Sequence, residues 1–380
     1  IKLPVSVKKM KLKLVGMTIL MLGLVAMSNP QVATAHSKNE SLTQLETNRE
    51  LNQLLREGKK LVEENKLSQA LSRYQHAQTL DPKNPRIFAT IGYLQAQQAN
   101  FQEAVNAWEK AVSFASDNSE FYYGLAYSLA NIENYADAAE AYQKTVSLDE
   151  NNLKAYFALS LMQIKQEKYD QALQSLEKVL QLSPNDSKAK RLQGLVLLKQ
   201  ERFTKAKSVL LEATQIRPND AKLQVMLGIA WLNLEQTSKA VEAFKQAAHL
   251  EPNQKGDLHL QIGQLLQIEG NVEEALANYE EALDLNPDLV KARKAIADIL
   301  LEQEEILMSI VNHRQVLEAN PDDASSYYHL GLALRDRDRI AEAITNLKKA
   351  LNLYQQQNQL EAVRKIKTIL QNLGNPINDI

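Results

Sequence analysis

The sequence predicts an all-α protein built as an array of helical hairpins. Helix-forming Ala, Leu, Gln, Glu and Lys abound, whereas the 380 residues include only 12 glycines and 10 prolines. No segment shows the alternation of β-branched residues that is typical of strands. A pattern of small and large residues also recurs about every 34 residues. Because 380 residues are too many for one ordinary core, an array of repeats explains both length and pattern.

The chain opens with a basic segment followed by an apolar run. Residues 1–35 contain five lysines and no acidic residue, and the uncharged run 14–27 has 14 residues. A membrane-spanning helix needs about 20 apolar residues, so this length favours a signal peptide over a permanent anchor. Ala33 and Ala35 are the small residues that a signal peptidase reads. We therefore expect cleavage after Ala35 and an exported protein in the periplasm or another extracytoplasmic space. An uncleaved anchor and a buried helix are the alternatives.

A polar segment, 36–50, links the signal to the first repeat. Within it, Ser41 and Gln44 have the spacing of a capping box, in which a hydroxyl and an amide each bond to the other residue's backbone. This pattern predicts that a helix begins near Ser41.

Three fixed positions define the repeat. The reference position is an alanine in eight of nine units, and its spacing is constant except for one extra residue before Ala275: Ala70, Ala104, Ala138, Ala172, Ala206, Ala240, Ala275, Ser309 and Ala343. A small residue lies twelve positions earlier: Gly58, Gly92, Ala126, Ser160, Gly194, Gly228, Gly263, Ala297 and Gly331. A larger residue lies four positions later: Tyr74, Trp108, Tyr142, Leu176, Leu210, Phe244, Tyr279, His313 and Leu347.

This spacing predicts two helices in each unit, each of about 14 residues. Residues four apart share a helix face, so Ala70 and Tyr74 lie on one stripe of the second helix. Glycine inside a helix costs about 1 kcal/mol, so glycines such as Gly58 indicate a close approach between helices. Prolines that block continuation of the second helix end six units: Pro82, Pro184, Pro218, Pro252, Pro287 and Pro321.

The small residue, the alanine, the aromatic and endings such as Leu80-Asp81-Pro82 resemble the tetratricopeptide repeat (TPR) family. The resemblance implies a right-handed superhelical solenoid of nine helix-turn-helix repeats, followed by a capping helix and tail over 358–380. The nine repeats are 51–84, 85–118, 119–152, 153–186, 187–220, 221–254, 256–289, 290–323 and 324–357. Ser309 and His313 depart from the pattern, so we expect 290–323 to be the loosest repeat.

The composition and the motifs of the sequence argue against an enzyme and against binding of nucleic acid or metal. Without residues 1–35, 39 basic residues stand against 46 acidic ones, and this acidic balance disfavours nucleic acid as a partner. No phosphate-binding loop, dinucleotide fingerprint, nucleophile elbow or zinc-protease motif occurs. His249 and His259 flank a turn, but two histidines without a third ligand are usually solvated or packed. We therefore predict no enzyme, no cofactor, no metal site and, after signal cleavage, no membrane contact.

The resemblance also implies that the first helices line a concave groove for a protein or peptide client. The predicted groove residues are Tyr93, Tyr123, Tyr127, Phe157, Leu161, Arg191, Leu195, Val225 and Ile229. Aromatic residues and arginine are the types that anchor interfaces. The alternative is that these side chains only pack between neighbouring first helices. The last three units present a more polar face with Gln264, Lys294, Asp298, Tyr328 and Arg335.

The predicted function is therefore a non-catalytic exported scaffold or adaptor. The resemblance points to envelope assembly or secretion as its setting. Two alternatives remain: a structural solenoid that associates with itself, and an accessory subunit of an enzyme complex acting as a glycosyltransferase or on peptidoglycan.

Overall fold

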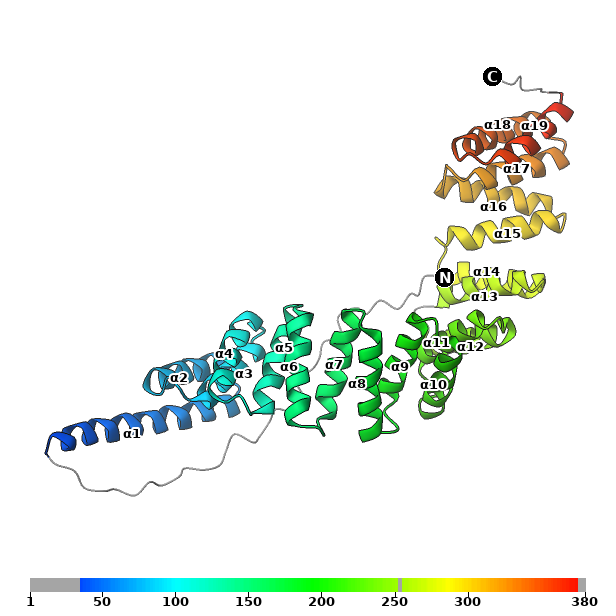
Figure 1. Ribbon diagram of the computed structural model, residues 1–380. Helices are drawn as coiled ribbons and strands as arrows, with labels where there is room; N and C mark the ends of the chain where they lie inside the picture. Colours follow the sequence, from blue (N-terminus) through cyan, green and yellow to red (C-terminus); the bar gives the residue numbers. More distant parts are fainter. Residues whose placement is uncertain (1–34, 252–254, 375–380) are drawn as a thin grey trace. The chain divides into compact units, whose positions relative to one another are not determined.

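The computed structural model describes residues 35–251 and 255–374, and within them it contains nineteen helices and no strand (Figure 1). This confirms the predicted all-α class. The predicted signal peptide lies, up to residue 34, outside the described residues. Among the described helices, none combines the length and apolar character needed to cross a bilayer.

The helices divide between two compact units, one ending at Leu182 and the other beginning at Ser183. The first unit contains α1 (Ala35–Glu63), α2 (Leu67–Leu80), α3 (Pro85–Gln97), α4 (Phe101–Phe114), α5 (Ser119–Asn131), α6 (Tyr135–Leu148), α7 (Leu153–Lys165) and α8 (Tyr169–Leu182). The second contains α9 (Ser187–Lys199), α10 (Phe203–Ile216), α11 (Ala221–Asn233), α12 (Thr237–Leu250), α13 (Lys255–Ile268), α14 (Val272–Leu285), α15 (Val290–Glu302), α16 (Ile306–Ala319), α17 (Ala324–Asp336), α18 (Ile340–Gln356) and α19 (Leu360–Asn372).

Each repeat is a pair of helices, from α1 and α2 to α17 and α18. Within each compact unit, every helix packs against its partner and against the helix that follows (Figure 1). The helix α1 is longer than predicted, because it begins at Ala35 rather than near Ser41. The capping-box residues therefore lie inside a helix and do not begin one.

Asparagine or aspartate caps many of the first helices. The Oδ1 atom of Asn118 accepts hydrogen bonds from the backbone N–H groups of Glu120 and Phe121, at 3.0 and 3.3 Å. Such a bond satisfies donors that have no partner inside the helix. The same type of cap is provided by Asn84, Asn152, Asp186, Asp220 and Asp323. These side chains recur because each repeat has to restart a helix after its closing turn.

The turn inside each repeat contains one residue in the left-handed backbone region. These residues are Asn65, Ala99, Glu133, Glu167, Glu201, Glu235, Gly270, Glu304 and Asp338. Non-glycine residues pay about 1–2 kcal/mol for this conformation. Only Gly270, with φ of +81°, avoids that cost in these nine turns.

The recurring glycines lie under the large residues of the second helices. A Cβ added to Gly92 would lie 2.9 Å from the ring of Trp108, and one added to Gly124 would lie 2.4 Å from the same ring. Trp108 therefore fills the space between the first helices of its own repeat and of the next. The equivalent contacts pair Gly58 with Tyr74, Gly194 with Leu210, Gly228 with Phe244, Gly263 with Tyr279 and Gly331 with Leu347. Close helix packing is thus the reason for these glycines.

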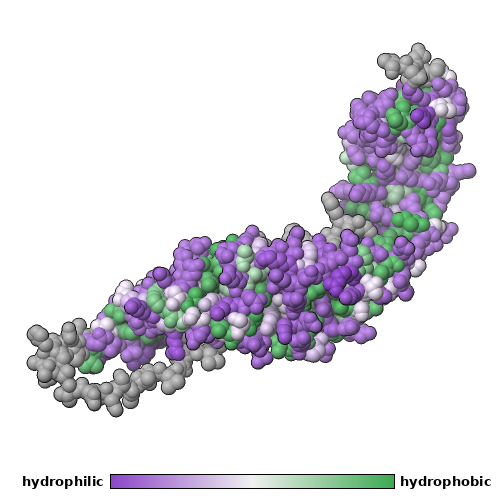
Figure 2. All heavy atoms as spheres, viewed as in Figure 1, coloured by the Kyte–Doolittle hydropathy of each residue, from purple (hydrophilic) through white to green (hydrophobic). Residues whose placement is uncertain are grey.

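Packing leaves mostly polar side chains outside. The visible face of each unit is predominantly hydrophilic, with smaller hydrophobic areas between the polar ones (Figure 2). The repeat 290–323 follows the same plan despite its departures, because Ser309 and His313 are fully buried. The Ser309 hydroxyl donates a hydrogen bond to the backbone oxygen of Ala297 at 2.9 Å. The burial of these two residues gives no sign of the loosening that we predicted.

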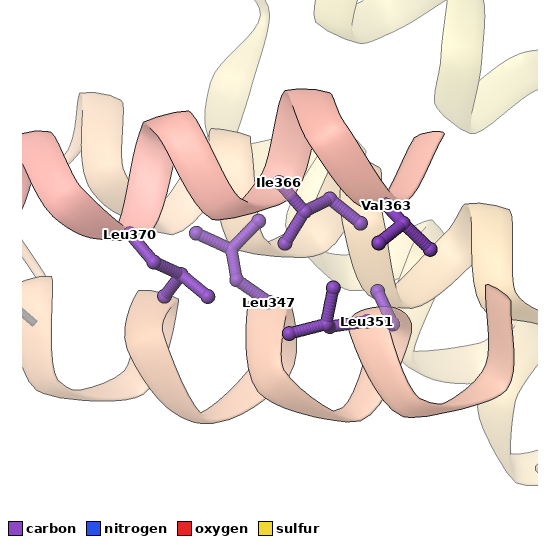
Figure 3. Packing of buried hydrophobic residues seen from close by; sticks show 6 residues of the cluster. Leu347, Leu351, Val363, Ile366 and Leu370 are labelled. Carbon is purple, nitrogen blue, oxygen red and sulfur yellow. The ribbon is translucent and has the colours of Figure 1, made fainter. Parts of the chain in front are cut away.

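The last helix covers the open end of the second unit. Val363, Ile366 and Leu370 of α19 are buried against Leu347 and Leu351 of α18 (Figure 3). Full burial of an aliphatic side chain contributes about 1.5–3 kcal/mol. The outer face of α19 carries charged residues, as a terminal cap requires.

Candidate partner-binding surface

Three of the predicted groove residues in the first unit are half-buried aromatic side chains. Tyr93, Tyr123 and Phe157 lie on α3, α5 and α7, which are successive first helices. The Tyr123 ring meets the ring of Tyr142 edge-on, with centroids 5.6 Å apart and planes at 72°. Burial raises the pKa of Tyr123 above its usual value, so its hydroxyl is neutral at physiological pH. Each ring therefore keeps some surface that a partner can cover.

The other two predicted residues in this unit are buried in the core. Tyr127 and Leu161 are only 8% and 6% exposed. The Tyr127 ring lies edge-on to Phe101, with centroids 6.2 Å apart. Packing between helices, the alternative raised from the sequence, describes these two side chains better than partner binding does.

The predicted groove residues of the second unit likewise include both buried and half-buried side chains. Leu195 and Ile229 are each 6% exposed, whereas Arg191 and Val225 are half-buried. The Arg191 Nη1 atom lies 2.9 Å from Oδ2 of Asp220, the residue that caps α11. Arg191 therefore connects α9 to the start of α11, and its Nη1 group is used inside the protein.

Lys294 repeats this arrangement further along the second unit. Its ammonium group lies 2.8 Å from both carboxylate oxygens of Asp323, the cap of α17. Burial acts to raise the pKa of Asp323, but hydrogen bonds from Lys294 and Ser326 outweigh it and hold that pKa below its usual value. The basic residues at this repeat position thus connect successive first helices.

Two open grooves in the first unit lie between neighbouring second helices. The larger, of about 890 Å³, runs between α6 and α8 with Tyr156 and Leu159 of α7 in its lining. Its lining includes six glutamines: Gln143, Gln163, Gln166, Gln171, Gln174 and Gln181. The smaller, of about 560 Å³, lies between α4 and α6 and includes Tyr122, Leu125 and Leu129 of α5.

The nine predicted groove residues line neither of these two grooves. Sequence reasoning missed the glutamines because single polar residues on helix faces are usually solvated. Their amides both donate and accept hydrogen bonds, which suits the polar backbone of an extended peptide. The only hint in the sequence is that glutamines recur at one-turn spacing, as at Gln163 and Gln166 or Gln171 and Gln174.

A cluster of polar residues was also missed. Asp298 of α15, His313 of α16 and His329 of α17 each offer an atom within 4.8 Å of the others. The Nδ1 atom of His329 is 2.5 Å from Oδ1 of Asp298, and Nε2 of His313 is 3.5 Å from the same oxygen. Burial lowers the pKa of His313 to about 4, although Asp298 opposes the shift. His313 is therefore neutral near pH 7.

The two histidines considered from the sequence do not form such a cluster. His259 instead places Nδ1 3.0 Å from the side-chain oxygen of Asn278, and His249 is exposed. Asp298, His313 and His329 escaped notice because they are well separated along the chain and lie on three different helices.

Family models match most of the repeat array in pieces. The Psidin N-terminal TPR repeats region matches residues 161–262, and anaphase-promoting complex, cyclosome, subunit 3 matches residues 97–179. Two tetratricopeptide repeat models match residues 256–289 and 314–359. No curated protein matches this chain in sequence.

The solved structures similar to this chain include TPR proteins. The C-terminal part of a TPR repeat-containing protein from Cytophaga hutchinsonii is 17% identical, with a TM-score of 0.57, and the match covers 64% of this chain and 99% of that one. YrrB, described as a TPR protein with an unusual peptide-binding site, is 24% identical over 50% of this chain and 96% of its own, with a TM-score of 0.43. MamA from Desulfovibrio magneticus RS-1 is 24% identical over 45% and 96%, with a TM-score of 0.42.

The repeated motif predicts pairs of helices, the fold contains them, and four family models match them. The chain is therefore a tetratricopeptide-repeat protein.

Proposed function

We propose that this chain is an exported, non-catalytic scaffold that binds a protein or peptide partner on the inner side of its first helices. The observation that carries the proposal is the row of half-buried aromatic residues Tyr93, Tyr123 and Phe157 on α3, α5 and α7. Partly exposed aromatic rings gain burial when a partner covers them, and they lose little conformational entropy because they are already packed.

The chemistry of these residues favours a partner segment with apolar side chains. Within the first unit the three rings offer apolar surface, and no charged residue belongs to the predicted set there. Arg191 in the second unit adds a charge, but its ion pair with Asp220 reduces what it can offer to a partner. The first unit therefore carries the proposed binding surface.

Paired variants of the first unit test this surface. The double change Tyr93→Glu and Phe157→Glu places charge on the proposed surface. The control, Phe114→Glu and Leu148→Glu, changes residues of second helices that are 42% and 38% exposed. Each protein is used to capture partners by crosslinking in the native host, and its helical content is checked by circular dichroism.

We expect the first double variant to lose crosslinked partners and the control to retain them, with equal helical content in both. Retention of the same partners by both variants would contradict the proposed surface. Light scattering on the wild-type chain addresses the self-association alternative, since a scaffold with a separate client is expected to be monomeric when purified alone.

The export part of the proposal is supported by the basic segment, the apolar run 14–27 and the small residues Ala33 and Ala35. It is tested by sequencing the N-terminus of the protein isolated from its host. A mature protein beginning at His36 is the expected result. An intact lysine-rich segment would overturn cleavage.

A further inference from the structure

Among the described residues of the second unit, His313 is the buried side chain with the most polar atoms lacking a hydrogen-bond partner. It occupies the repeat position held by large residues such as Phe244 and Tyr279, and it is fully buried. In the described part of the chain, neither of its ring nitrogens has a hydrogen-bond partner. Its Nε2 atom lies 3.5 Å from Asp298 Oδ1, which is too long for a good hydrogen bond. A buried nitrogen in this state costs free energy unless something else coordinates it.

The atoms around His313 are those that bind transition metals. One carboxylate oxygen from Asp298 and one ring nitrogen each from His313 and His329 lie within 4.8 Å of one another. Two imidazoles and a carboxylate form a ligand set used for zinc and related divalent ions. Bonds of about 2.0–2.1 Å in a tetrahedral site place ligand atoms about 3.3 Å apart. The two distances to Asp298 Oδ1, 2.5 and 3.5 Å, lie on either side of that value.

The three side chains can close around an ion, and the site stays accessible to solvent. His313 is held rigidly by burial, whereas the side chains of His329 and Asp298 are 28% and 27% exposed. Small movements of these two side chains bring all three ligand atoms to a common distance from an ion. The exposed sides of His329 and Asp298 also provide a path for the ion and leave a coordination position for water.

Charge near the cluster permits a cation. Besides His329, the basic side chain that acts on His313 is Lys294. Its ammonium group is held by both carboxylate oxygens of Asp323, so it does not neutralise Asp298. A divalent ion between Asp298 and the two imidazole rings therefore meets the negative charge of that carboxylate.

We propose that Asp298, His313 and His329 form a site for a divalent transition metal ion such as Zn²⁺. The ion is coordinated from α15, α16 and α17, so it links the second helix of the repeat 290–323 to the first helix of the repeat 324–357. Its fourth ligand is water. The site explains why a histidine occupies a core position that is aromatic or aliphatic in the other repeats.

Calorimetric titration of the full chain with Zn²⁺, in the presence of a competing chelator, tests the site. We expect saturable binding of one ion per chain. Asp298→Asn and His329→Ala should each weaken the affinity at least tenfold. His313→Phe should abolish binding while preserving the fold, because phenylalanine fills the equivalent position at Phe244. Co²⁺ bound to the wild type should show visible absorption bands that His313→Phe lacks.

The matched control is His259→Gln, since His259 is a half-buried histidine of the same unit that contacts Asn278 outside the cluster. This variant should bind Zn²⁺ as the wild type does. Hydrogen exchange of α15 to α17 provides a second readout, with slower exchange in the presence of Zn²⁺ for the wild type and the control but not for His313→Phe. Absence of stoichiometric binding would overturn the proposal. So would equal binding by the wild type and His313→Phe, which would mean adventitious binding to surface histidines.

Discussion

Tyr142 and Tyr279 occupy the same position in two different repeats, but their hydroxyl groups have different surroundings. Both side chains are fully buried. The Tyr279 hydroxyl donates a hydrogen bond to Oε1 of Gln267 at 2.8 Å. The Tyr142 hydroxyl has no partner among the described residues. Replacing each tyrosine by phenylalanine therefore has opposite expected effects on the free energy of unfolding.

The magnitudes follow from the cost of burying an unpaired hydroxyl. Phenylalanine at Tyr142 keeps the ring contact with Tyr123 and removes an unsatisfied polar group, so we expect stabilisation of about 1 kcal/mol. Phenylalanine at Tyr279 removes a hydrogen bond and leaves Gln267 without that donor, so we expect a loss of about 1 kcal/mol. The two variants should thus differ by about 2 kcal/mol.

Hydrogen exchange at the repeat concerned is the suitable assay, because a long repeat array need not unfold in a single step. Amides of α6 should exchange more slowly in Tyr142→Phe, and amides of α14 should exchange faster in Tyr279→Phe. Urea unfolding of the same variants supplies the direction of the overall effect. Destabilisation by Tyr142→Phe as large as that by Tyr279→Phe would refute the reasoning, since it would mean that the Tyr142 hydroxyl is satisfied in solution.

Two further predictions concern the backbone and pH. Gly270→Ala should destabilise the chain by about 1 kcal/mol, because φ is +81° and no atom lies within 4 Å of the added Cβ to compensate for the strain. Ala99→Gly, at φ of 63°, should do the reverse, and equal urea midpoints for these two variants would contradict the assignment of strain to the turns. Burial raises the pKa of Tyr279 to about 12 from its usual 10. A raised folded-state pKa stabilises the protein below pH 10, and about 2 kcal/mol of this is lost as the pH rises from 10 to 12. In Tyr279→Phe that alkaline loss, measured by urea unfolding, should be smaller, and an unchanged pH profile would count against the role of Tyr279.

Much of the fold was predictable because its information is local. A repeat needs a small residue on one helix, an alanine and a large residue on the other, and a turn between them, all within a short stretch of chain. The contact between Gly92 and Trp108 shows why, since that glycine is required by a side chain of its own repeat. The start of α1 at Ala35 was not predicted, because the capping box at Ser41 also fits a helix interior.

The candidate site depended on contacts that the repeat pattern does not contain. Tyr93 and Tyr127 hold the same repeat position, yet Tyr93 is half-buried and Tyr127 is 8% exposed with Phe101 against its ring. Exposure differs because the neighbouring repeat supplies different side chains at each place. The glutamine-lined groove between α6 and α8 likewise takes its lining from two neighbouring repeats.

From the amino-acid pattern alone follow the helix pairs, their count and their packing residues, since these are set by spacing within a repeat. The tertiary structure alone shows which of the predicted groove residues remain accessible, and it brings Asp298, His313 and His329 together from three helices. The physical reason is that burial and coordination depend on distances between side chains of different repeats, and such distances are determined by how the helices pack.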